Sequence, residues 1–372
     1  MASHTRIKKI VIFETLFVVV VAVYALWSIV RAASTSIPDF SVLYYSAQNL
    51  LAGRSLYHDT TLYTGLGYPA VSLVPYIPFT ILPYKIAASV WVVLSFAAYL
   101  ATTYLSLRLV GKESVRLWAI VSAVGFLAFP TKFTFGMGQV NYIALSLLLL
   151  GVSSLRLAPP IRSMVLAISL LFKPHFIFVY VGLFFTELRK YIVMSVVGVV
   201  CLFVLMGALR GWAPDREYLR DMVPHLLAYE SREIYYNQGV GGFISRIFGG
   251  NSAYLSYGVI VVIISSSIYT LIKKERRSAL HMLAVLLPMQ ILVEPLAWQH
   301  HLVFLLPTFV IAWFTSSSRA WQRKMILMAC FLLVGWNIKN PVYWQGNMIG
   351  SLVLSHGFIG CFVLWYMSIR DL

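Results

Sequence analysis

Asp39 is a carboxylate placed just after the chain leaves its first long apolar run, residues 10–30. The chain holds only 13 acidic residues, so a carboxylate at this point stands out. An ionisable group beside or inside a bilayer is costly to keep, which makes it a candidate for function. The position therefore favours a catalytic or binding role for Asp39. The alternative is a helix cap, because Pro38-Asp39 ahead of an apolar helix is a common helix start.

A lysine and a histidine flank a helix break inside apolar sequence, in Leu171-Phe172-Lys173-Pro174-His175-Phe176. The ends of two half-helices and a buried cation together form an anion site. We therefore assign Lys173 and His175 to the binding of an anionic substrate. The alternative is a lysine at the outer interface that extends its ammonium group to water.

Two further polar clusters contain groups that bind sugars or phosphates. Gln139 and Asn141 open a membrane segment, directly after a glycine-rich stretch. Arg232, Asn237 and Gln238 lie in the second long polar segment. An arginine can pair with phosphate, and the two amides can hydrogen-bond the oxygens of a sugar or a pyrophosphate-like group.

The histidine pair His300-His301 follows Trp298 at the outer end of an apolar run. Adjacent residues point to different faces of a helix, so at most one of the two is expected to face a site. They lack the i, i+4 spacing of two zinc ligands on one helix face. We also find no carboxylate cluster that demands a divalent cation, and no P-loop, GxSxG, HExxH or Rossmann motif. We therefore expect no metal and no cofactor.

Composition places these residues in a membrane protein. The chain is 60% hydrophobic and 11% charged, with a mean hydropathy of +0.80, which indicates a polytopic membrane protein. Its net charge of +16 is explained by basic cytoplasmic loops and by contact with anionic membrane lipids, so we expect no nucleic-acid partner. The three cysteines lie in apolar runs without CxxC spacing, which is typical of packing residues.

The basic residues decide the predicted topology. If residues 163–172 and 176–185 form a two-limbed element that turns at Lys173-Pro174, the strongly basic loops share the side of the amino terminus. A single span there would place the basic run 273–277 outside, against the positive-inside rule. We predict an all-α polytopic membrane protein of about twelve transmembrane or re-entrant helices, with residues 1–372 forming one domain. The long polar segments 34–85, 210–253 and 339–347 are then expected together on the outer face, with short interfacial helices.

The first of these segments contains one clear amphipathic pattern. Apolar side chains at positions 40, 43, 44, 47, 50 and 51 follow helical spacing, and Gly53 ends the run. The pattern predicts an interfacial helix with Asp39 at its start and Tyr44 within it. Tyr68-Pro69 and several further prolines follow, which is typical of a chain that runs along the interface.

Taken in order, these segments resemble the C-type membrane glycosyltransferases, and specifically glycosyltransferase family 87, which includes a mannosyltransferase that extends phosphatidylinositol mannosides. The likeness covers roughly residues 35–310. It rests on Asp39-Phe40 with Tyr44-Tyr45, Ala52-Gly53 and Tyr57, on Tyr68-Pro69, Gly138 to Asn141, Lys173-Pro174, Asn237-Gln238, and Trp298 to His301. The chain departs from the family pattern at Gly239, where a serine is expected, and at Gln299, where an acidic residue is more usual and would assist the histidine.

The resemblance implies a GT-C-like fold, a sugar donor carried on a polyprenyl phosphate, and transfer on the non-cytoplasmic face with inversion at the anomeric carbon. It implies Asp39 as the general base and one of His300 and His301 as a second catalytic residue. The leaving phosphate needs cationic and hydrogen-bonding stabilisation more than a strong general acid. The residues expected to bind the substrates are Tyr44, Tyr68, Gln139, Asn141, Lys173, His175, Arg232, Asn237 and Gln238.

The sequence therefore predicts an inverting glycosyltransferase of a bacterial inner membrane, with mannose as the expected sugar and a lipid-linked or glycan acceptor. The alternative is a transporter or flippase of lipid-linked sugars, which charges along a midspan pathway would favour. A noncatalytic subunit of a cell-envelope synthesis complex is a third reading. The ionisable groups gather at one face, which favours chemistry at the interface.

Overall fold

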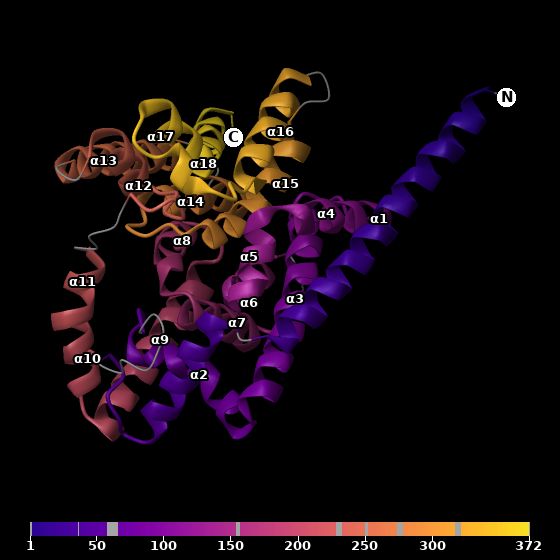
Figure 1. Cartoon of the computed structure of the whole chain (residues 1–372). Helices are drawn as coiled ribbons and strands as arrows, with labels where there is room; N and C mark the ends of the chain where they lie inside the picture. Colours follow the sequence, from indigo (N-terminus) through magenta and orange to yellow (C-terminus); the bar gives the residue numbers. More distant parts are fainter. Residues whose placement is uncertain are drawn as a thin grey trace.

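The chain is helical throughout the part that the computed structural model describes, which is residues 2–35, 37–57, 66–153, 157–227, 233–249, 252–273, 278–316 and 321–371. Figure 1 shows the arrangement of these helices. The first half comprises α1 (Ala2–Ser34), α2 (Pro38–Leu51), η1 (Ala70–Ile81), α3 (Tyr84–Leu109), α4 (Val115–Leu127), α5 (Phe129–Met137), α6 (Asn141–Val152), α7 (Pro159–Phe172), η2 (Pro174–Phe176), α8 (Ile177–Leu183) and α9 (Arg189–Arg210). The second half comprises α10 (Ala213–Glu217), η3 (Tyr218–Met222), α11 (Val223–Leu227), α12 (Val240–Phe248), α13 (Ala253–Lys273), α14 (Ala279–Val293), η4 (Gln299–Leu305), α15 (Leu306–Thr315), α16 (Trp321–Gly335), η5 (Pro341–Trp344), α17 (Met348–Leu354) and α18 (His356–Asp371).

Within the described ranges, four helices are long and apolar enough to cross a membrane: α1 over Val11–Ser34, α3, α9 and α13. Three bent helix pairs raise the number to seven if each pair forms one span. The prediction of about twelve membrane segments is therefore not confirmed. Several of the predicted spans are short helices, such as the 12 residues of α6, whereas a helix needs about 20 residues to cross a bilayer.

The chain turns sharply at Lys173, as the sequence predicts. The axes of α7 and of the segment Pro174–Leu183 differ by 118°. Proline lacks the backbone N–H that would continue the helix and disfavours helical geometry at the residue before it. Lys173 accordingly has φ −139° and ψ 83°. The turn presents the lysine side chain from the end of α7 rather than from its flank.

The predicted helix after Asp39 is also present, as α2. It ends at Leu51, and Gly53 follows with a positive φ of 68°. Its apolar face is buried against η1 and contains Phe40, Leu43 and Ala47. This packing fixes the first turn of α2, where Asp39 lies.

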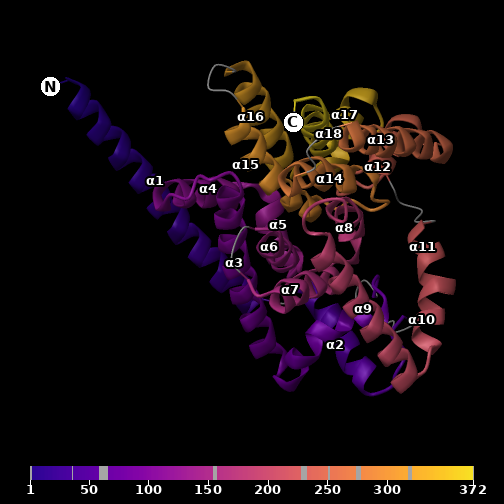
Figure 2. The ribbon, with the colours of Figure 1, turned by 180° about the vertical axis from the view of Figure 1, so that it is seen from behind.

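The expected placement of the three long polar segments on one outer face stays a prediction. α2 lies at one end of the ribbon and α17 at the other in both views (Figures 1 and 2). The C-terminal helices α14, α16 and α18 pack together, while α17 packs against η5 and α12 on this bundle. The candidate site lies between the two ends, where α5, η2 and the end of α14 meet η4.

Candidate active site

The ammonium group of Lys173 is the centre of the candidate site. The lysine is fully buried. Its Nζ donates to the hydroxyl of Tyr68 at 3.1 Å and lies 3.0 Å from Nε2 of His301. An unpaired charge in a protein interior costs several kcal/mol. A buried cation therefore has to be balanced by an anion nearby.

Glu294 is the buried carboxylate of this cluster. Its side chain is only 8% exposed, and its Oε2 lies 3.0 Å from Nδ1 of His301. Its Oε1 contacts Nδ1 of His175. Burial alone would raise the pKa of Glu294, but His301 and His175 hold it well below its ordinary value. The carboxylate is therefore ionised, and His301 connects it to Lys173.

His301 links the carboxylate to the lysine. Burial lowers the pKa of its imidazole, against the opposing pull of Glu294, and the charge of Lys173 lowers it further. A neutral imidazole has one donor and one acceptor nitrogen. With the proton on Nδ1 facing Glu294, Nε2 accepts from the ammonium group of Lys173. The three side chains thus form one continuous chain of contacts that holds the cation in place.

Glu294 reaches this position because the chain turns directly after α14. Glu294 leaves helical geometry, with φ −65° and ψ 130°, and Pro295 follows it. Gly239 packs against this turn. A Cβ on Gly239 would lie 2.8 Å from the carbonyl oxygen of Glu294 and 3.2 Å from the Cβ of Ala297. The glycine found where the family pattern predicts serine therefore allows the close approach of these two segments.

Asp39 lies in the first turn of α2, and Gln139 donates a hydrogen bond from its Nε2 to the aspartate carboxylate. Ile37, not Asp39, occupies the cap position of the helix, and it makes no capping side-chain bond. Burial raises the pKa of Asp39, while the hydrogen bond from Gln139 and the charge of Lys173 offset part of the rise. Asp39 is thus a partly buried carboxylate within electrostatic reach of the buried lysine.

Gly138 brings Gln139 against the start of α2. It ends α5 with a left-handed φ of 71°, a conformation that glycine adopts without strain. A Cβ there would lie 2.9 Å from the Cβ of Ile37 and 3.0 Å from that of Phe40. Trp91 fixes the same loop by donating from Nε1 to the carbonyl oxygen of Gly138 at 2.8 Å.

The two adjacent histidines face different surroundings, as predicted, and His301 is the one that joins Lys173. The His300 ring instead lies near the rings of Phe133 and Trp298, with centroids 5.4 Å and 6.5 Å away. Asn141 and Thr134 donate to the backbone carbonyl of His300, at 2.9 Å and 3.2 Å. Asn141 therefore positions the histidine segment through the backbone.

Other predicted binding residues are hydrogen-bonded within the protein. Gln238 donates from Nε2 to the carbonyl oxygens of Tyr235 and Leu354, at 2.6 Å and 2.9 Å. Asn237 donates to the carbonyl oxygen of Pro295 at 3.2 Å, and its Oδ1 accepts from the backbone of Ala297 at 3.1 Å. Asn237 therefore holds the loop beside the end of α14 and Gln238 holds it beside the end of α17, and their binding of substrate stays a prediction.

Tyr44 donates to the carbonyl oxygen of Leu82 at 2.7 Å, which ties α2 to the segment after η1. Its predicted contact with substrate likewise stays a prediction. Arg232, the proposed phosphate partner in the second polar segment, lies outside the described residues.

Sequence reasoning missed Glu294 as a site residue. The signal was present, because Glu294 is one of only 13 acidic residues and directly follows the largely apolar helix Ala279–Val293. The family pattern directed attention to position 299 for an acidic partner of the histidine, whereas Glu294 contacts His301 here. Over the described residues, no three His, Cys, Asp or Glu side chains are grouped as metal ligands would be.

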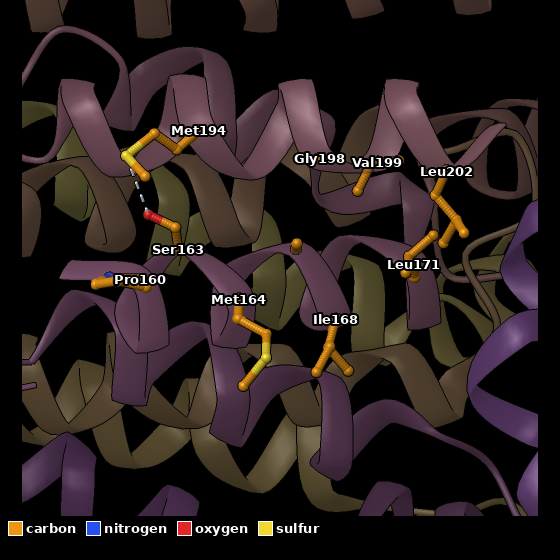
Figure 3. Close-up of a pocket in the computed structure, with 10 residues that line it drawn as sticks. Pro160, Ser163, Met164, Ile168, Leu171, Met194, Gly198, Val199 and Leu202 are labelled. Atoms are coloured by element: carbon orange, nitrogen blue, oxygen red, sulfur yellow. Dashed lines mark hydrogen bonds between the residues drawn. The ribbon is translucent and has the colours of Figure 1, made fainter. Parts of the chain in front are cut away.

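An apolar groove lies between α7 and α9, with a volume of about 390 Å³. Figure 3 shows its lining side chains, with Pro160 and Met194 toward one end and Leu171 and Leu202 toward the other. Met164 and Met194 on its walls are 55% and 50% exposed.

Comparison with known proteins gives one family and several distant relatives. The model of glycosyltransferase family 87 matches residues 66–295. The chain is 26% identical over 248 residues to a polyprenol-phosphate-mannose-dependent alpha-(1-2)-phosphatidylinositol pentamannoside mannosyltransferase of Mycolicibacterium smegmatis, over 64% of this chain and 59% of the relative. It is 26% identical over 270 residues to the protein of the same name from Mycobacterium tuberculosis strain CDC 1551, over 65% of this chain and 57% of the relative.

A third relative is the polyprenol-phosphate-mannose-dependent alpha-(1-2)-phosphatidylinositol mannoside mannosyltransferase of Mycobacterium tuberculosis strain H37Rv. It is 23% identical over 299 residues, which are 73% of this chain and 69% of the relative. The chain thus spans less than two thirds of the length of the first two relatives. No solved structure matches the chain significantly.

Proposed function

This chain belongs to glycosyltransferase family 87, and we propose that it transfers a sugar, expected to be mannose, from a polyprenyl-phosphate donor to a hydroxyl of a lipid-linked or glycan acceptor. The reaction takes place at the outer surface of the bacterial inner membrane. The names of the three mannosyltransferase relatives support the donor class. Asp39 and the histidine pair lie outside the matched residues 66–295, so their assigned roles rest on their contacts.

The observation that carries the proposal is the fully buried ammonium group of Lys173 within electrostatic reach of Asp39. A transferase of this kind needs a base for the acceptor and a cation for the leaving phosphate. Lys173 is fixed by Tyr68 and by the chain of contacts through His301 to Glu294. It therefore offers a positioned positive charge where a lipid phosphate would be released.

The proposed step is a single displacement. The acceptor hydroxyl loses its proton to Asp39 as its oxygen forms a bond to the anomeric carbon of the sugar. The bond from the anomeric carbon to the phosphate oxygen breaks at the same time, and its electron pair leaves with the lipid phosphate. Lys173, with His175 at the edge of the cluster, stabilises the charge on that phosphate. Attack from the face opposite the leaving group inverts the anomeric configuration.

The test is Asp39→Asn, measured as mannose transfer from labelled polyprenyl-phosphate mannose to mannoside-bearing glycolipids, beside a separate measurement of donor binding. General-base catalysis contributes about 10²–10⁴-fold, so turnover should fall by at least the lower figure while donor binding persists. Asparagine caps a helix about as well as aspartate, so a helix-capping role predicts near-normal turnover.

Asp215→Asn is the matched control, because Asp215 also follows a proline in the first turn of a helix, α10. It should leave turnover unchanged. Normal turnover in Asp39→Asn would refute the role of Asp39 as the general base. Movement of intact donor across the bilayer by wild-type protein, without sugar transfer, would point to a flippase instead.

A further inference from the structure

The groove between α7 and α9 follows one face of α7 over nearly its whole length. Its α7 wall begins at Pro160 and ends at Leu171, through side chains spaced three or four residues apart. At 1.5 Å per residue this face is about 16 Å long. Among the described residues, no charged side chain lines the groove. Ser163, the one hydroxyl group among them, donates to the sulfur of Met194 at 3.8 Å. The chemistry of the groove fits a long hydrocarbon chain.

Gly198 lines the α9 side of this groove without a side chain that would fill it. It lies in the interior of α9, where glycine is less favourable than alanine. Mid-helix glycines are commonly explained by close packing, yet a Cβ on Gly198 would meet no atom within 4 Å. The glycine leaves open space in the groove rather than allowing a neighbour to approach.

One end of the groove, at Leu171, lies near the buried cation in the chain. Leu171 lines the groove, and Lys173 is two residues further along the same chain. η1 packs against both α7 and α9, and Tyr68, which contacts Nζ of Lys173, lies two residues before η1. The apolar face of α7 therefore ends two residues before Lys173, beside the segment that carries Tyr68.

We propose that this groove binds the phosphate-proximal part of the polyprenyl chain of the donor, so that the enzyme recognises the lipid as well as the sugar. The proposal rests on the proposed function, because the phosphate at Lys173 is what sets the direction of the chain. A groove that merely faces bulk lipid would bind any acyl chain and would not affect the choice of donor.

The experiment compares two donors, mannose on a long-chain polyprenyl phosphate and mannose on a short-chain, citronellyl-type phosphate. The variant Gly198→Leu fills the groove. Gly258→Leu is the matched control, since Gly258 is also an exposed glycine inside a helix, α13, whose added Cβ would meet no atom within 4 Å. Gly198→Ala provides a smaller filling at the same position.

Wild-type protein should have a lower KM for the long-chain donor. Gly198→Leu should raise that KM roughly tenfold, which corresponds to about two methylene groups no longer buried. The KM for the short-chain donor should change little, Gly198→Ala should lie between, and Gly258→Leu should match wild type. The proposal is overturned if the KM for the long-chain donor is unchanged in Gly198→Leu, or if it rises equally in Gly258→Leu. The groove would then simply contact bulk lipid.

Binding of the sugar-free polyprenyl phosphates, by native mass spectrometry, separates this inference from the proposed function. If wild-type protein transfers no sugar, chain-length-dependent binding that Gly198→Leu abolishes still supports the groove. Binding that ignores chain length, or that Gly198→Leu leaves intact, refutes the groove even where sugar transfer is normal.

Discussion

Replacing Glu294 with glutamine removes the only charge in direct contact with both His301 and His175 among the described residues, at almost no change in side-chain size. The amide cannot balance the ammonium group of Lys173, which is fully buried. Removing one partner of a buried charge pair costs about 3–5 kcal/mol. Hydrogen bonds to charged groups contribute about 1.5–3 kcal/mol each. If only one such contact is lost at the transition state, kcat/KM for the donor should fall by about 10–100-fold.

The assay is sugar transfer at varied donor concentration, together with thermal unfolding in detergent. Glu294→Gln should lower both kcat/KM for the donor and the melting temperature, and KM for the acceptor should change much less. The matched control is Glu113→Gln, which breaks a largely exposed pair with Arg108 at the same 3.0 Å separation. Exposed pairs contribute about 0–1 kcal/mol, so this variant should stay near wild type.

A double-mutant cycle with Lys173→Met tests the cause of the Glu294→Gln effect. If the carboxylate acts by balancing the lysine, the double variant should be more stable than the sum of the single losses predicts, by about 0.5–3 kcal/mol. Additive losses, or a Glu294→Gln enzyme with normal donor kinetics, would refute the reasoning.

Two further predictions follow from the contacts of Asp39 and of Glu294. Gln139→Leu removes a hydrogen bond that lowers the pKa of Asp39. Because the base must be ionised, the acidic limb of the pH–kcat/KM profile should move to higher pH. An unmoved limb would show that the ionisation of Asp39 does not cause it. Gly239→Ser restores the family residue but places a Cβ 2.8 Å from the carbonyl oxygen of Glu294. It should lower both melting temperature and turnover, whereas Gly136→Ser, where an added Cβ would meet no atom within 4 Å, should not; normal turnover in Gly239→Ser would show that the segment can shift.

Local patterns predicted the local structure well. Helical spacing from Phe40 to Leu51 predicted α2, and Lys173-Pro174 predicted the sharp turn after α7. Both depend on backbone rules that act within a few residues of one another. The number of membrane segments was harder to predict. Short apolar helices such as α6 have the composition of a membrane span, but they are buried by tertiary packing.

The contacts between distant segments could not be read from the sequence. Gln139 is 100 residues from Asp39, and nothing local to either position indicates that one donates to the other. The approach depends on the left-handed Gly138 and on the ring packing of Phe40 against Trp91, whose centroids are 4.9 Å apart. A glycine motif marks the possibility of such an approach but not the partner.

The histidine pair shows how an ambiguity in sequence is resolved by charge. His300 and His301 are equivalent candidates by type and spacing, and adjacency alone says only that they diverge. Lys173 and Glu294 are both buried. Buried charged groups need polar partners, and a group that lies between the two can serve both. His301 fills that gap with one donor and one acceptor nitrogen, whereas His300 lies against aromatic rings. The buried lysine thus selects which histidine belongs to the anion site, and it does so through a carboxylate that is separated from His301 by six residues of chain.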